Sequence, residues 1–128
     1  MGLDMYFTRQ PKTNSTVDPH RYSQEVGYFR KHNALHQWLV THAQNGVDMC
    51  DSTELSQELL TKCANIVENA CILRDGSLLP PSTEGYFFGS SAVDEWYWSQ
   101  MVRTHETLQY ILHTTDWKNE SVYYQSSW

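Results

Sequence analysis

The sequence GLDMYFTR, residues 2–9, alternates apolar and polar side chains close to the start of the chain. Leu3, Met5 and Phe7 would share one side of an extended backbone, because successive side chains of a β-strand point to opposite faces. We therefore predict a first strand over residues 2–9 with one face turned toward the core. The polar stretch 10–20 that follows contains two prolines, which is typical of a surface loop that can close over a site.

The last eight residues, SVYYQSSW (121–128), also have the composition of a strand and end on Trp128. An indole is an unusual choice for a solvated chain end, so we expect this strand to be docked. Its expected neighbour is either the first strand or a short buried strand at residues 86–88, which Gly89 would end.

Helical spacing of apolar side chains characterises three segments between the two ends of the chain. The predicted helices cover about residues 23–43, 53–71 and 91–113, and Ser52 or Thr53 would cap the second. Three helices packed on a small, mainly antiparallel sheet that includes both chain termini make an α+β fold.

The composition excludes several classes of partner. The chain carries 15 acidic and 9 basic residues, a net charge of −6, and the basic residues follow no single stripe. Duplex nucleic acid is therefore not an expected partner. No apolar run approaches the ~20 residues that cross a bilayer, and the first residues do not resemble a secretion signal. We expect one domain spanning residues 1–128, in the cytoplasm and without a membrane partner.

Ionisable residues interrupt the apolar face of the first predicted helix. Glu25, His32 and His36 fall among apolar positions, and burying such groups is costly unless they are paired or bind something. The two histidines stand four residues apart, a spacing that can hold a metal, but the sequence offers no general base between them and identifies no third ligand. For Glu25 and His36 two interpretations remain open, a polar pair that contacts a ligand and buried groups that only fix the packing.

Cations and tryptophans supply further candidate ligand-binding residues. Arg30 and Lys31 point away from the apolar face of the predicted helix, where they are either simply solvated or placed to meet a phosphate. Trp96, Trp98 and Trp128 are candidates for stacking on a flat heterocycle or for a protein-binding hot spot. The alternative is that these tryptophans fill the core of a small domain.

The sequence motifs of common catalytic and cofactor sites are absent. The chain contains no Gly-x-Gly-x-x-Gly, no Gly-Lys-Ser/Thr and no Cys-x-x-Cys. We therefore predict no catalytic residues, no metal and no cofactor, and we favour a binding protein over an enzyme.

Short motifs spread over almost the whole chain occur together in this sequence. They are GLDMY (2–6), EVGY (25–28), RK (30–31) with Asn33, His36 and Trp38, LLP (78–80), GYFFGS (85–90), DEWY (94–97) and YYQSSW (123–128). In this combination they resemble a family of small proteins that tailed bacteriophages and prophages encode. The resemblance implies a bacteriophage setting, in the cytoplasm of the infected bacterial host, and no mechanism.

Two positions depart from the pattern of that family. Its members usually carry Trp where Phe29 stands and a small residue such as Ala where His32 stands. The second departure weakens the case for a metal held by His32 and His36. Small accessory proteins of phages often block a host function, some by binding host proteins and some by sequestering nucleotide-like immune signals.

The leading hypothesis is a phage accessory protein that binds a small polar, nucleotide-like ligand without turnover. Two alternatives remain open, a protein-interaction module that inhibits a host factor and a small hydrolase that uses Glu25 and His36 as acid and base. A homo-oligomer is a further expectation for so short a chain. The residues predicted to bind the ligand are Glu25, Arg30, Lys31, His36, Trp96, Trp98 and Trp128.

Overall fold

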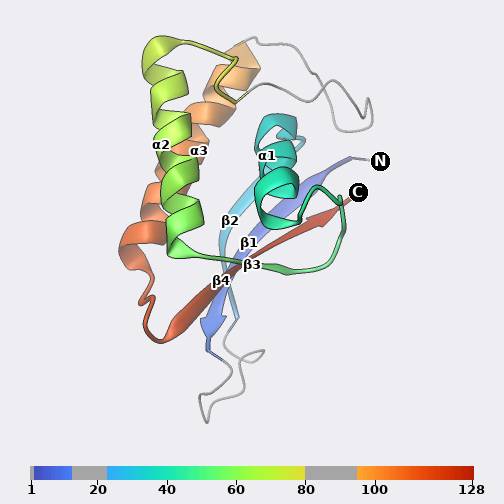
Figure 1. Cartoon of the computed structure of the whole chain (residues 1–128), viewed down its shortest axis with the longest axis vertical. Coiled ribbons are helices and arrows are strands. Elements are labelled where there is room, and N and C mark those ends of the chain that lie inside the picture. Colours follow the sequence, from blue (N-terminus) through green and yellow to red (C-terminus); the bar gives the residue numbers. More distant parts are fainter. Residues whose placement is uncertain (1, 13–22, 80–94) are drawn as a thin grey trace.

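The computed structural model describes residues 2–12, 23–79 and 95–128 (Figure 1). The elements within these ranges are β1 (Asp4–Pro11), β2 (Gln24–Arg30), α1 (Asn33–Ala43), β3 (Thr53–Leu55), α2 (Gln57–Leu73), α3 (Glu95–Thr114) and β4 (Glu120–Ser127). Three helices and one antiparallel sheet confirm the predicted α+β class.

The sheet is antiparallel throughout, and its strands lie in the order β2-β1-β4-β3. The two terminal strands form its central pair, in which Asp4 lies opposite Ser127 and Pro11 lies opposite Glu120. The two chain ends are therefore neighbours, as Figure 1 shows. This register confirms that the C-terminal strand is docked beside the first.

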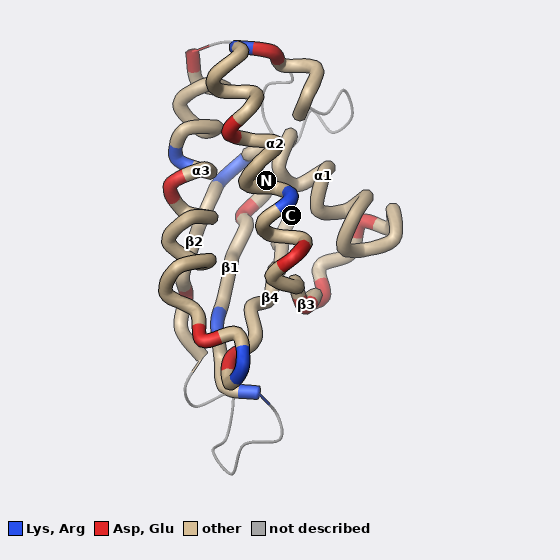
Figure 2. The backbone as a smooth tube through the Cα atoms, turned by 60° about the vertical axis from the view of Figure 1, so that its left-hand side comes forward, with Lys and Arg blue, Asp and Glu red and all other residues tan. Residues whose placement is uncertain are grey.

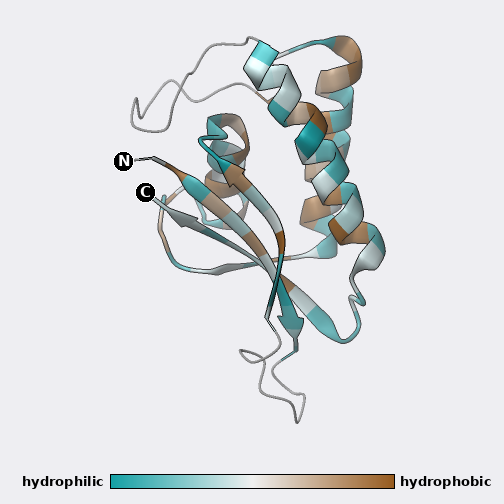
Figure 3. Ribbon diagram, turned by 180° about the vertical axis from the view of Figure 1, so that it is seen from behind, coloured by the Kyte–Doolittle hydropathy of each residue, from teal (hydrophilic) through white to brown (hydrophobic). Residues whose placement is uncertain are grey.

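The helices cover one face of this sheet. Met5 and Phe7 of β1, and Val122 and Tyr124 of β4, are buried on that face, whereas the residues that alternate with them on β1 are only partly buried. Seen from behind, in Figure 3, none of the described helices lies in front of the strands. The core is therefore a single layer between the sheet and the helices, and the other face of the sheet is less covered.

The predicted helix over residues 23–43 is wrong in its first part. Residues 24–30 form β2, which pairs with β1, and helix begins only at Asn33. Pairing with β1 makes these residues a strand, and β2 passes close to α3, since a Cβ added at Gly27 would lie 2.8 Å from Cγ2 of Thr107. An extended strand with glycine at this point lets β2 approach α3 closely. The aromatic side chains that suggested a helical stripe instead alternate across a strand.

The start of the second helix also differs from the prediction. Thr53 lies in β3, which pairs with β4, and α2 is capped by Ser56, whose Oγ accepts a 3.1 Å hydrogen bond from the Leu59 backbone N–H. The sequence offers several hydroxyl residues here, and the one nearest the apolar repeat caps the helix.

The third helix has the inward face that its spacing predicts. The described part of α3 buries Tyr97, Met101, Thr104, Leu108 and Ile111. None of the described helices combines the length and the apolar composition that a membrane crossing requires. The predicted helix start near residue 91, the predicted strand at 86–88 and most of the predicted loop at 10–20 lie outside the described residues.

Candidate functional site

A pocket of about 330 Å³ lies between the end of β2 and the first half of α3. In Figure 2 the cationic segments at the end of β2 and on α3 lie on the same side of the molecule. Three of the predicted ligand-binding residues, Arg30, Lys31 and Trp96, meet here. The described residues that line the pocket are Tyr28, Arg30, Lys31, Trp96, Gln100 and Arg103.

The wall on α3 follows from helical spacing. Trp96, Gln100 and Arg103 stand four and three residues apart, so their side chains share one face of the helix. Nη2 of Arg103 donates a 2.7 Å hydrogen bond to the backbone carbonyl oxygen of Tyr28 on β2. The guanidinium carbon also lies 5.0 Å from the centre of the Phe29 ring. These contacts hold Arg103 against the edge of the sheet.

The turn between β2 and α1 places Lys31 in an uncommon backbone conformation. Its φ is +58°, in the left-handed region, and its N–H donates a 2.7 Å hydrogen bond to the Leu3 carbonyl oxygen. The other described non-glycine residues with positive φ, Asn45 and Arg74, follow the C-terminal ends of helices, where this conformation is usual. Lysine at position 31 therefore costs backbone energy that glycine or asparagine would largely avoid.

One carboxylate lies beside the pocket and partly balances its charge. Oδ1 of Asp4 accepts a 2.6 Å hydrogen bond from the Tyr28 hydroxyl and lies 3.9 Å from Nε of Arg30. The hydrogen bond to this carboxylate raises the pKa of Tyr28, with smaller contributions from burial and from the charge of Asp4. Tyr28 therefore stays protonated at neutral pH, and its ring packs 5.3 Å from that of Tyr6.

His32 is buried next to the pocket without lining it. Its Nε2 lies 2.8 Å from Oγ1 of Thr104, and that hydroxyl donates its only hydrogen to the Gln100 carbonyl oxygen. Nε2 of His32 therefore carries the proton that the hydroxyl accepts. Burial, and then the positive charge of Arg103, lower the pKa of His32 to about 3, so the ring is neutral.

Glu25 lies on a different element from the one predicted. It is an exposed residue of β2, opposite Thr8 of β1, and not part of the helix that carries His36. The spacing argument that placed Glu25 and His36 on one helical face is therefore wrong. Glu25 does not line the pocket.

His36 belongs to a separate buried cluster. Its Nδ1 lies 2.6 Å from the Tyr124 hydroxyl and its Nε2 lies 3.0 Å from Oδ1 of Asp48. In the neutral ring Nε2–H donates to the carboxylate and Nδ1 accepts from the phenol. Burial raises the pKa of Tyr124 above its ordinary value, with a further contribution from Asp48. Since Tyr124 is fully buried, this arrangement fits a packing role better than contact with a ligand.

The other two candidate tryptophans, Trp98 and Trp128, do not line the pocket either. Nε1 of Trp128 donates a 3.2 Å hydrogen bond to Asp48, which attaches the C-terminal residue to the His36 cluster. Trp98 is partly buried against the core, with its ring 4.9 Å from that of Tyr97 and the Arg74 guanidinium carbon 5.1 Å from its centre. The packing interpretation therefore fits Trp98, and Trp96 is the tryptophan that faces the pocket.

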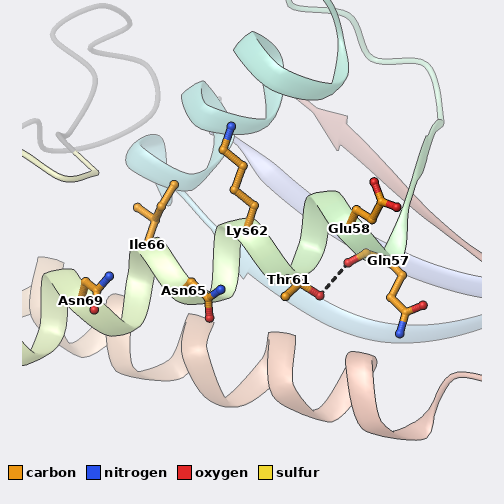
Figure 4. Close-up of a pocket in the computed structure, with 7 residues that line it drawn as sticks. All are labelled: Gln57, Glu58, Thr61, Lys62, Asn65, Ile66 and Asn69. Carbon is orange, nitrogen blue, oxygen red and sulfur yellow. Dashed lines mark hydrogen bonds between the residues drawn. The ribbon is translucent and has the colours of Figure 1, made fainter.

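A larger pocket, of about 550 Å³, follows the outer side of α2 (Figure 4). In this view Lys62 and Ile66 point away from Gln57 and Asn65, and the Thr61 hydroxyl donates a 2.8 Å hydrogen bond back to the Gln57 carbonyl oxygen. The lining has amides, one cation and one carboxylate but no aromatic ring. It therefore offers neither a charged cluster nor a stacking surface.

No group of three potential metal ligands occurs within residues 2–12, 23–79 and 95–128. The pocket includes three residues that the sequence reasoning missed, Tyr28, Gln100 and Arg103. The spacing of Trp96, Gln100 and Arg103 on one helical face could have indicated the last two. Tyr28 could not be found in this way, because residue 28 was assigned to a helix.

Comparisons of the chain with models of protein families, with curated proteins and with solved structures found no match.

Proposed function

We propose that this protein binds a small anionic, nucleotide-like ligand in the pocket between β2 and α3. One observation carries the proposal: three cationic side chains, Arg30, Lys31 and Arg103, line a single pocket in a chain whose net charge is −6. Clustered cations repel one another unless an anion lies between them. Arg offers a planar set of donors that matches phosphate oxygens, and Lys adds a point charge.

An aromatic side chain at the same pocket favours a ligand with a flat ring. Trp96 lines the pocket and is 40% exposed. The ring of Tyr28 instead packs against that of Tyr6, on the face of the sheet that the helices do not cover. Stacking on an aromatic side chain contributes about 1–3 kcal/mol for each nucleic acid base. The lining therefore fits a ligand that carries both a phosphate group and a base.

The residues of the lining support binding of the ligand without its chemical conversion. No Asp, Glu, His or Cys is among the described residues that line the pocket. General acid–base chemistry at neutral pH is carried mostly by those side chains. In the phage setting implied by the sequence resemblance, the role we propose is sequestration of a nucleotide-derived host signal.

Titration calorimetry with a panel of nucleotides tests this proposal. The panel contains mononucleotides, cyclic dinucleotides and ADP-ribose derivatives, and Trp96→Ala is compared with Trp128→Ala. Both tryptophans are about equally exposed, but only Trp96 lines the pocket. At least one ligand should bind, and its affinity should fall about tenfold or more in Trp96→Ala and remain unchanged in Trp128→Ala. Absence of heat across the panel, or equal losses in the two variants, would overturn the proposal.

A further inference from the structure

The charges around the pocket define the kind of phosphate that it fits. Three cations line it, and the neighbouring carboxylate of Asp4 offsets part of the charge of Arg30 at 3.9 Å. The described residues around the pocket therefore carry a net charge of about +2. A phosphate monoester carries roughly −1.5 to −2 charges at pH 7, because its second pKa is about 6. A phosphodiester carries a single negative charge.

The size of the pocket limits how much of a ligand it can enclose. Its volume of about 330 Å³ is near the lower end of the range of roughly 300–1,000 Å³ that is typical of small-molecule sites. This space suits one base, one sugar and one phosphate better than two joined nucleotides. Trp96 offers aromatic surface for the one base.

We propose that the ligand of this pocket is a mononucleotide with a terminal phosphate monoester, which Arg30, Lys31 and Arg103 bind as a dianion. This inference rests on the proposed function and narrows it from nucleotide-like anions in general. It selects monoesters over diesters by charge, and nucleotides over free phosphate by the aromatic ring of Trp96.

The pH dependence of binding follows from the ligand and not from the protein. Among the described residues, the charged and titratable groups that line or adjoin the pocket are Asp4 of β1, Tyr28 and Arg30 of β2, Lys31, His32 before α1, and Arg103 of α3. His32, whose ordinary pKa of about 6.5 falls closest to neutrality, has a pKa lowered to about 3 and stays neutral at pH 5.5. Only the monoester itself gains a proton as the pH falls through about 6.

The experiment is titration calorimetry of the full chain with AMP, 3′,5′-cyclic AMP, adenosine and inorganic phosphate at pH 7.5, and with the two nucleotides at pH 5.5. AMP should bind at least tenfold more tightly than the other three at pH 7.5. Its affinity should fall about fourfold at pH 5.5, where roughly a quarter of the phosphate remains dianionic, whereas that of cyclic AMP should not change.

The results that would contradict the monoester inference differ from those that would contradict the proposed function. Equal affinity for AMP and cyclic AMP, or an affinity for AMP that does not change with pH, would overturn the monoester inference and leave the nucleotide site intact. Equal affinity for inorganic phosphate and AMP would overturn the role of the Trp96 ring. If none of these compounds binds but a cyclic dinucleotide or an ADP-ribose derivative does, the inference is wrong and the proposed function stands. If nothing in the wider panel binds, both are wrong.

Discussion

Arg103 on α3 donates a 2.7 Å hydrogen bond to the backbone carbonyl oxygen of Tyr28 on β2. Since β2 lies at the edge of the described sheet, none of the described strands donates a hydrogen bond to this carbonyl from that side. This hydrogen bond therefore has two effects. It provides a partner for a carbonyl oxygen at the edge of the sheet, and it holds a guanidinium group at the pocket.

This double role predicts that two arginine variants behave differently. Arg103→Gln should lower the free energy of unfolding by about 1 kcal/mol, because a hydrogen bond to the backbone is lost, and should also weaken nucleotide binding. Arg30→Gln should weaken binding alone, since the Arg30 side chain is 64% exposed and its ion pair with Asp4 is long. Denaturant titration and calorimetry on both variants check this. Unchanged nucleotide affinity in both would contradict the placement of the site.

The left-handed backbone of Lys31 predicts a variant with opposite effects on stability and binding. Lys31→Asn should leave stability equal or increase it by up to about 1 kcal/mol, because Asn adopts this conformation more readily, while nucleotide affinity falls. Arg74→Asn is a matched control, with a similar φ and the same loss of charge but no place in the pocket. Thermal unfolding and calorimetry on both variants provide the measurement. Equal affinity in Lys31→Asn and the wild-type protein would show that the lysine is not part of the site.

Burial of His32 predicts that stability falls in mild acid. Its pKa is about 3 in the folded chain and about 6.5 when unfolded, so below pH 6.5 the unfolded state binds more protons. The stabilisation is complete above pH 6.5 and is lost progressively as the pH falls toward 3. From pH 7.5 to 5.5 the wild-type protein should lose about 1.4 kcal/mol more than His32→Gln. If the free energy of unfolding, measured with urea, depended on pH in the same way in both proteins, the buried neutral imidazole would be contradicted.

Close approach of β2 to α3 predicts that Gly27 tolerates no side chain. In Gly27→Ala the added Cβ would lie 2.8 Å from Cγ2 of Thr107 and 3.3 Å from Cδ2 of Phe7, and the free energy of unfolding should fall by about 1–3 kcal/mol. Thr107→Ser removes that Cγ2 and should restore part of the loss in the double variant. A double-mutant cycle measures this coupling. A purely additive result would mean that the two residues do not meet.

The sequence could predict those elements whose local pattern of apolar residues also shows which side faces the core. The alternation of Leu3, Met5 and Phe7 marks a strand with one buried face, and all three are fully buried. The inward residues of α3 follow in the same way from a 3.6-residue period. In both cases one buried face produces the pattern.

The wrong prediction of a helix over residues 24–30 shows which elements a local apolar pattern cannot identify. Tyr28 and Phe29 are compatible with a helical stripe and with a strand, and the choice between them is made by pairing with β1 and by the space that Gly27 leaves for Thr107. Both contacts join residues far apart in sequence. For the same reason Arg30, Lys31 and Trp96 could be named as candidates one by one, but the meeting of Arg30 and Lys31 with the residues on α3 could not be predicted.

The location of the bound ligand is the central claim, and nuclear magnetic resonance tests it most directly. In a titration of the ¹⁵N-labelled protein with AMP, the account predicts saturable shifts of the Tyr28–Lys31 amides and of the Trp96 indole N–H. The indole N–H of Trp128 and the amides along Gln57–Asn69 should remain in place. Shifts confined to the α2 pocket or to the Trp128 and Asp48 region, with none at Tyr28–Lys31 and Trp96, would contradict it.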